Sequence, residues 1–303
     1  MSAPVTSRSH LRVARRWRMP WLAFLTALFF FVGAVVLLLP TIANWFSQVT
    51  QAAEISELAN EVRDLGAESL HDAIEQAHAY NRTLTGGAIV ASGERLPSTS
   101  GEAEMGQLAY ADMLAADAAG LMARIRIPDI GVDLPVYHGT SDATLNEGVG
   151  HLEGTALPVG GEGTRSVLTA HRGLATAELF SLLDRVEIGD TFTIETFGEV
   201  LTYQVVTTEV VRPEDSKAVN PELGRDLVTL VTCTPLGINS HRILVTGERI
   251  LPTPAGDVAL ANGPPTIPGF PWWIFVLVGV ALVLTLYVAF SGRPRRAKPT
   301  PTS

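Results

Sequence analysis

The sequence contains one cysteine, Cys233, in surroundings that suit a nucleophile. It ends the apolar run LVTLVTC (227–233), and Arg242 follows nine residues later. A lone thiol cannot form an intramolecular disulfide, so Cys233 is either a buried small hydrophobic residue or a catalytic group. A thiolate nucleophile needs a proton acceptor and a cation that stabilises an oxyanion. Arg242 opens the next strand, and in an antiparallel pair its guanidinium would lie beside the thiol.

Four histidines in the same region are candidates for the proton acceptor. His171 ends the apolar run SVLTA (166–170), a position at which a strand can present a side chain to a cleft. His138 and His151 lie in turn-rich stretches and stay open as alternatives, either as bases or as structural imidazoles. His241 neighbours Arg242 on one strand, so the two side chains should point to opposite faces. Position alone therefore leaves His171, His138 and His151 open.

Short β-like runs predict the scaffold that positions these residues. Seven runs rich in Val, Ile and Thr lie between residues 121 and 250, separated by turn residues. This pattern predicts a mainly β fold, a closed β-barrel of about eight strands, with short helices near 141–147 and 176–184. Residues 51–84 carry an apolar stripe at helical spacing, and we expect two helices there, broken near Gly66.

Two uncharged apolar segments, 21–39 and 271–290, are long enough to cross a membrane at about 1.5 Å per residue. Residues 1–20 and 291–303 contain nine of the 22 basic residues and no acidic residue. Because cytoplasmic segments collect Lys and Arg, we expect both termini inside the cell and residues 41–270 outside. The first segment exceeds a signal-peptide core of about 7–15 residues, which favours an anchor over a cleaved signal. All 31 acidic residues fall between the tails, so nucleic acid is not an expected partner.

The motifs LTAHRG (168–173) and TLVTCTP (229–235), followed by the arginine of NSHRILVTGERI (239–250), resemble the sortases, the cysteine transpeptidases of Gram-positive cell surfaces. The resemblance covers about residues 121–250. It implies that Cys233 is the nucleophile and His171 the acid/base, that Arg242 anchors substrate and oxyanion, and that Thr232 shapes the substrate cleft. It further implies cleavage of Leu-Pro-x-Thr-Gly (LPxTG) signals after threonine, a thioester intermediate and transfer to an amine. No metal or organic cofactor is implied.

Within the sortases, three features resemble class C, which polymerises pili: the amphipathic N-terminal region, the phrases YHGTS and VGHLEGTALPVGG, and the second membrane segment. The implied partners are pilins or other surface proteins with LPxTG-like signals, and the implied acceptor is a pilin lysine. One alternative is a housekeeping sortase that attaches proteins to a cell-wall precursor. A second alternative is a non-enzymatic two-span binding protein whose β-domain merely resembles a sortase.

The loop before the barrel departs from the class C pattern. Class C sortases usually carry a lid with an Asp-Pro-aromatic motif, and residues 85–120 contain no Asp-Pro. Instead, Leu96-Pro97-Ser98-Thr99 matches the first four positions of a sorting signal. One hypothesis is a pseudo-substrate lid in which Leu96, Pro97 and Thr99 occupy the cleft, and the alternative is a chance match in an ordinary loop.

The expected organisation follows from these segments. It comprises a cytoplasmic tail (1–20), a membrane helix (21–39), an extracellular helical region (40–84), a lid loop and connector (85–120), the sortase-type barrel (121–250), a Pro/Gly linker (251–270), a second membrane helix (271–290) and a cytoplasmic tail (291–303).

Overall fold

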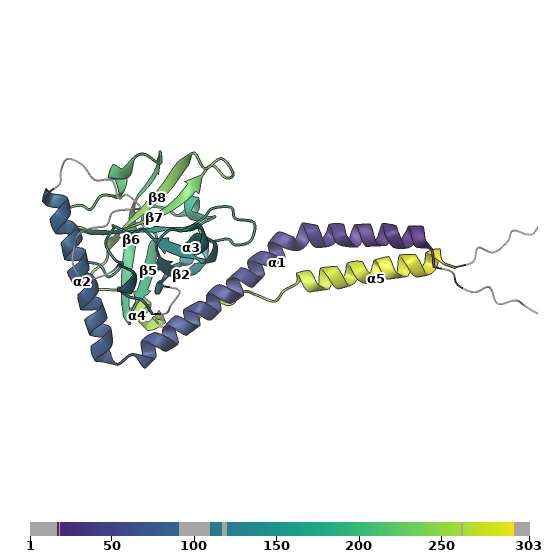
Figure 1. The fold of residues 1–303 in the computed structure, drawn as a ribbon, viewed down its shortest axis with the longest axis horizontal. Helices are drawn as coiled ribbons and strands as arrows, with labels where there is room; N and C mark the ends of the chain where they lie inside the picture. Colours follow the sequence, from purple (N-terminus) through teal and green to yellow (C-terminus); the bar gives the residue numbers. More distant parts are fainter. Residues whose placement is uncertain (1–16, 18, 91–109, 117–119, 262, 294–303) are drawn as a thin grey trace, which may run out of the picture. The chain divides into compact units, whose positions relative to one another are not determined.

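The computed structural model describes residues 17, 19–90, 110–116, 120–261 and 263–293 (Figure 1). The chain forms two compact units. One consists of the described residues up to Ile42 together with those from Phe270 onward, and the other of Ala43–Gly269. The predicted catalytic residues all belong to the second unit.

Two described helices are long and apolar enough to cross a membrane, α1 (Trp21–Asp64) and α5 (Trp273–Ser291). Nothing in α5 is buried, and little of the apolar part of α1 is. A core helix of a soluble protein would bury such a surface against other elements. Helix α1 continues past Leu39, the predicted end of the membrane segment, through Pro40 to Asp64. Proline is tolerated in such helices although it removes one hydrogen bond.

The second unit is built on a closed eight-stranded barrel, as the sequence predicts. Around the barrel the order is β1-β2-β3-β4-β7-β8-β6-β5. The pairs β2–β3 and β4–β7 are parallel, and the other pairs are antiparallel. The strands are β1 Leu121–Ile127, β2 Val132–His138, β3 Val149–His151, β4 Thr164–Thr169, β5 Thr191–Thr196, β6 Glu199–Val211, β7 Asp226–Thr234 and β8 His241–Arg249.

The barrel interior is apolar, and the strands place apolar side chains at their buried positions. Strand β5 alternates strictly between buried and half-buried residues, which places Phe192 and Ile194 inside. The ring of Phe192 stacks on Tyr203 of β6, with 5.5 Å between their centres. Gly247 of β8 faces this pair, and a Cβ there would come within 2.5 Å of the Phe192 ring. The stacked rings therefore require glycine at this position of β8.

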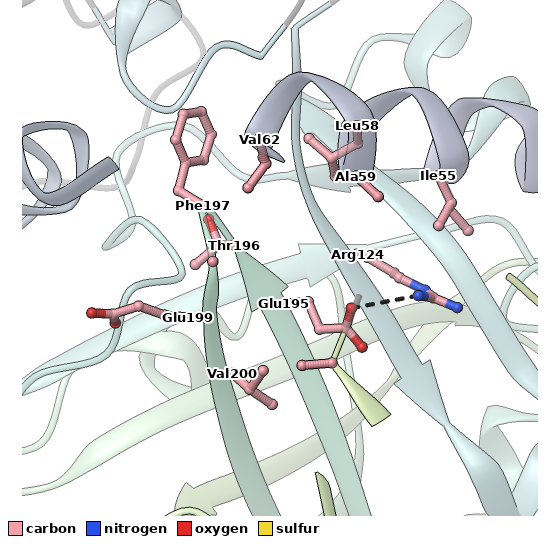
Figure 2. A pocket seen from close by; sticks show the side chains of 12 residues that line it. Ile55, Leu58, Ala59, Val62, Arg124, Glu195, Thr196, Phe197, Glu199 and Val200 are labelled. Atoms are coloured by element: carbon pink, nitrogen blue, oxygen red, sulfur yellow. Dashed lines mark hydrogen bonds and ion pairs between the residues drawn. The ribbon is translucent and has the colours of Figure 1, made fainter. Parts of the chain in front are cut away.

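The end of α1 and helix α2 (Ala67–Val90) belong to the barrel unit (Figure 1). Ile55, Leu58 and Val62 of the predicted stripe are buried and project from α1 toward the strands (Figure 2). On α2, Asn81 is buried and hydrogen-bonds the backbone of Leu157 twice: its Oδ1 accepts from N (2.7 Å) and its Nδ2 donates to O (3.0 Å). The predicted break at Gly66 is confirmed, since α1 ends at Asp64 and α2 begins at Ala67.

The segment 251–270, which we expected as a plain linker, is bound to the barrel through described residues up to Thr266. It contains a short helix, α4 (Ala255–Leu260). Arg124 of β1 is buried, forms a bidentate pair with Asp133 (2.7 and 2.9 Å) and donates to Gly263 O (2.9 Å). The backbone N of Thr266 donates to Asp133 Oδ2 (2.7 Å). Burial raises the pKa of Asp133, but the hydrogen bonds from Arg124 and Thr266 outweigh it and lower the pKa overall.

We therefore predict that a soluble form ending at Ile250 is less stable than one ending at Gly269. Truncation removes the carbonyl of Gly263 from a buried guanidinium and the amide of Thr266 from a buried carboxylate. Losing partners of buried charged groups should cost about 2 kcal/mol in the free energy of unfolding, or roughly 4–8 °C in Tm. Thermal denaturation of both forms checks this, and equal Tm values would contradict it.

Of four other elements, one agrees with the expectation and three differ. Residues 176–184 form turns and a short 3₁₀ helix (Leu183–Arg185) instead of a helix. The helix α3 (Asp142–Glu147) forms as predicted, with Ser141 Oγ accepting from Thr144 N at its start. Strand β3 has only three residues, too few to show an alternating pattern. Helix α2 extends to Val90 through Gly86 and Gly87, because glycine disfavours a helix by only about 1 kcal/mol per residue.

Candidate active site

Strands β7 and β8 bring Cys233 and Arg242 together. The antiparallel register pairs them directly, and the next pair is Thr234 with His241. Side chains of directly opposed residues lie on the same face, with Cβ atoms about 4.5–5.5 Å apart. This is the neighbour relation that the sequence predicts for the thiol and the guanidinium. Both side chains are only partly buried, so the pair is open to a substrate.

The guanidinium of Arg242 is held from one side only. Its Nη1 donates to the backbone oxygens of Asn239 (2.9 Å) and His241 (3.0 Å). Among the described residues Nη2 and Nε have no hydrogen-bond partner, so this edge of the planar fork remains for another group. Two fixed carbonyl contacts on Nη1 orient that free edge, as binding of a carbonyl or an oxyanion requires.

His171 lies beside Cys233 at the ends of β4 and β7. The parallel register pairs Thr169 with Val231, and Ala170 N donates to Val231 O (3.1 Å) beyond the strand end. Two contacts then flank His171 and Cys233. Thr232 Oγ1 donates to Ala170 O (2.7 Å), and Arg172 Nη1 donates to Thr234 Oγ1 (2.9 Å). Since the residues before and after His171 bond to the residues before and after Cys233, the two lie side by side.

The side chain of Thr232, which we expected to shape the substrate cleft, is buried. Thr232 is 1% exposed, and its hydroxyl is bonded to the backbone of Ala170. A side chain so buried cannot touch a substrate directly, so its observed contact fixes the end of β4.

The other two candidate histidines belong to a separate structural network around Tyr110. His151 is fully buried, its Nδ1 accepts from the Tyr110 hydroxyl (2.8 Å), and its Nε2 donates to Ala156 O (2.9 Å). Both ring nitrogens of His138 bond backbone oxygens, those of Gly120 and Met113. Burial raises the pKa of Tyr110 and keeps its hydroxyl a donor. No contact joins this network to Cys233 within the described part of the chain.

We predict that His151 makes stability depend on pH. Burial, aided by the charge of His138, lowers the pKa of His151 from 6.5 to about 4, although the bond to Ala156 opposes the shift. Between these values the unfolded chain takes up a proton that the folded chain does not. The contribution of His151 to the free energy of unfolding is therefore complete above pH 6.5. It declines as the pH falls toward 4, by up to roughly 3 kcal/mol.

Denaturant unfolding at pH 7 and pH 4.5 measures this effect. His151→Gln should show a smaller loss of stability on acidification than the unaltered protein, and His71→Gln, which changes an exposed histidine of α2, should show the same loss. An equal loss in all three proteins would remove His151 as the cause.

Of two hollows in the described barrel unit, one adjoins the candidate site. An open hollow is lined by Val210, Val211, Arg212, Glu214, Asp215 and His241. It adjoins the site because Val211 is the β6 partner of Arg242. The other, between α1 and β5–β6 (Figure 2), has a volume of about 20 Å³ and includes Arg124 and Glu195. That volume holds about one water molecule, so it is no substrate cleft.

The lid residues of the hypothesis, Leu96, Pro97 and Thr99, lie outside the described residues. In the described part of the chain no group of three or more His, Cys, Asp or Glu side chains is arranged to hold a metal ion. Arg172 and Thr234 are also part of this site. No sequence pattern singles them out, although each directly follows a predicted catalytic residue.

Comparisons with known proteins agree with this fold. A sortase domain family matches residues 125–250. Sortase C-1 from Actinomyces oris is 47% identical with a TM-score of 0.53, and the match covers 60% of this chain and 98% of that one. Sortase C from Streptococcus pneumoniae is 42% identical with a TM-score of 0.57, covering 65% and 96%. Sortase D of Bacillus subtilis is 29% identical over 130 residues, 42% of this chain and 62% of that protein's length.

The chain therefore belongs to the sortase family, and its structural neighbours place it in class C. Sortases are cysteine transpeptidases. The alternative of a non-enzymatic binding protein loses its support. The chain spans less than two thirds of the length of the Bacillus sortase.

Proposed function

We propose that this protein is a membrane-anchored transpeptidase that cleaves LPxTG-like sorting signals after threonine and transfers the acyl group to an amine. The observation that carries the proposal is the direct pairing of Cys233 with Arg242, next to the strand end that bears His171. A thiol, an imidazole and a fixed guanidinium at one end of a barrel are the groups that acyl transfer requires.

In the proposed reaction, the thiol of Cys233 gives its proton to His171 as its sulfur attacks the threonine carbonyl and forms a C–S bond. The free edge of Arg242 stabilises the oxyanion of the tetrahedral intermediate. His171 gives its proton to the glycine nitrogen as the C–N bond breaks, which leaves a thioester. An incoming amine then loses a proton to His171 and attacks the thioester, the C–S bond breaks, and His171 returns the proton to the sulfur of Cys233. The amide bond that breaks is replaced by an amide bond, so no cofactor is needed.

We infer that the acceptor is a pilin lysine. The inference rests on the neighbours, which include sortase C1 of GBS Pilus Island 1 and a pneumococcal sortase C described in terms of pilin substrate specificity. The runner-up acceptor is a cell-wall precursor, as in housekeeping sortases.

Co-expression with a pilin-like protein that carries an LPxTG-like tail tests the proposal in a host without its own sortases. Pilus polymerisation predicts a covalent ladder that survives boiling in detergent and disappears with Cys233→Ala. A Lys→Arg change at the receiving lysine should also remove it. If instead the substrate appears only on wall fragments released by a muramidase, the housekeeping alternative is correct.

We also infer that the barrel lies outside the cell, with both termini inside. The support is the absence of acidic residues and the excess of Arg and Lys in both tails, next to α1 and α5. The single thiol is a built-in reporter. A membrane-impermeant maleimide should label Cys233 in intact cells and should not label Cys233→Ala. Labelling that requires cell lysis would reverse the proposed orientation.

A further inference from the structure

His171 lies beyond the regular part of β4. The strand ends at Thr169, and residues 170–173 follow as irregular backbone. The ladder between β4 and β7 therefore does not itself fix the imidazole against the thiol. On the side of Ala170 the connection is the buried hydroxyl of Thr232. On the other side of His171 the backbone bonds to residues 180 and 181, so a further contact is needed to link this segment to the strand end after Cys233.

Arg172 supplies that connection with all three nitrogens of its guanidinium. Nη1 donates to Thr234 Oγ1 (2.9 Å), Nε donates to Ser181 O (3.3 Å), and Nη2 pairs with Asp184 Oδ2 (2.6 Å). The Arg172 side chain is only 10% exposed, whereas that of Asp184 is 46% exposed. A buried planar fork held from three directions is a rigid element, and a lysine cannot reproduce it.

The backbone around Arg172 is tied to the same loop. Phe180 N donates to His171 O (3.2 Å), and Gly173 N donates to Ser181 Oγ (3.0 Å). Gly173 has a positive φ of 71°, and a Cβ there would approach Leu236 Cδ2 to 2.2 Å. Residues 180–184 thus hold residues 171–173 in place. Within the described residues, Arg172 is the only member of this segment whose side chain hydrogen-bonds the strand end after Cys233.

We propose that Arg172 is a positioning residue that holds His171 in register with Cys233 through its bond to Thr234. This inference rests on the proposed function, in which His171 transfers the protons. The proposed role of Arg172 is geometric and not electrostatic, because Asp184 neutralises its guanidinium. The bond that carries the role joins Arg172 to Thr234, across the ends of β4 and β7. Misplacing a catalytic group by about 1 Å can cost up to a hundredfold in rate.

A double-mutant cycle tests the proposal on the full chain, with turnover of a synthetic LPxTG peptide and the alkylation rate of Cys233 by iodoacetamide. Arg172→Lys should lower kcat roughly tenfold or more while KM stays within about twofold. If Arg172 acts through His171, Arg172→Lys should not change the alkylation rate further in a His171→Ala background, in which turnover is already nearly lost. Thr234→Val, which removes the acceptor and keeps the shape, should lower kcat in the same direction.

Asp184→Asn is the matched control. It removes a partly exposed charge but keeps a side-chain oxygen that can accept from Nη2, and it leaves the bond to Thr234, so a geometric role predicts turnover within about threefold of the unaltered protein. Wild-type kcat in both Arg172→Lys and Thr234→Val would overturn the proposal, as would an equal effect of Arg172→Lys with and without His171. An inactive Asp184→Asn would assign the effect to charge instead. If the unaltered protein ignores the peptide, the proposed substrate fails, whereas the alkylation cycle still tests Arg172.

Discussion

Cys233→Ala should abolish both peptide cleavage and ladder formation while leaving the Tm within a few degrees. The thiolate is the acyl carrier in the proposed reaction, so no other group can hold the intermediate. Cys233 is only partly buried, and losing one sulfur atom leaves no large cavity. Peptide turnover and thermal denaturation of the purified variant check both halves of this prediction.

The histidines provide the controls for that result. His171→Ala should be nearly as damaging to turnover as the cysteine change. His138→Ala and His151→Ala should instead reduce mainly stability, because their rings bond backbone oxygens and Tyr110, not the thiol. A near-normal ladder from the His171 variant would move the acid/base role to another residue.

Arg242→Lys should lower kcat/KM on the order of a hundredfold, the scale for losing one oxyanion donor. Lysine keeps the positive charge but lacks the planar fork. In the protein, Nη1 of Arg242 donates to two backbone oxygens, and Nη2 and Nε have no hydrogen-bond partner among the described residues. An ammonium group is a point charge on a flexible stem, so it cannot hold those oxygens with one edge and present a second, fixed edge to an oxyanion.

Arg212→Lys is a suitable comparison for this change. Arg212 is exposed and lines the open hollow next to the site. Its conservative replacement should leave turnover within about twofold. Full activity of Arg242→Lys would reduce Arg242 to a source of positive potential and would exclude a bidentate role.

How far the sequence predicts this site depends on how local each contact is. Cys233 and Arg242 are nine residues apart on consecutive strands, so their pairing follows from the short connection between two β-like runs. His171 could not be separated from His138 and His151 in the same way, because the pairing of β4 with β7 is parallel and crosses 62 residues in sequence. Periodicity shows that a strand exists but not which strand lies beside it.

The elements predicted wrongly from the sequence also depend on contacts between residues that are far apart in the chain. The run around Leu179 and Phe180 has helical spacing, but hydrogen bonds from the His171 loop to residues 180 and 181 hold it as turns. Residues 251–266 read as a linker because their partners are distant. The sequence shows Arg124 in the run ARIRI, but not that this arginine would be buried under the carbonyl of Gly263.

The two halves of the site also differ in when they can form during folding. The β7–β8 hairpin closes a short loop, and hairpins of this kind form in microseconds. Joining β4 to β7 closes a loop of about sixty residues, and such non-local parallel pairing is intrinsically slow. A newly made chain can therefore pair its thiol with Arg242 well before the pairing of β4 with β7 brings His171 beside Cys233. Until the barrel closes, the cysteine lacks its proton-transfer partner, so acyl-transfer activity is withheld from partly folded chains.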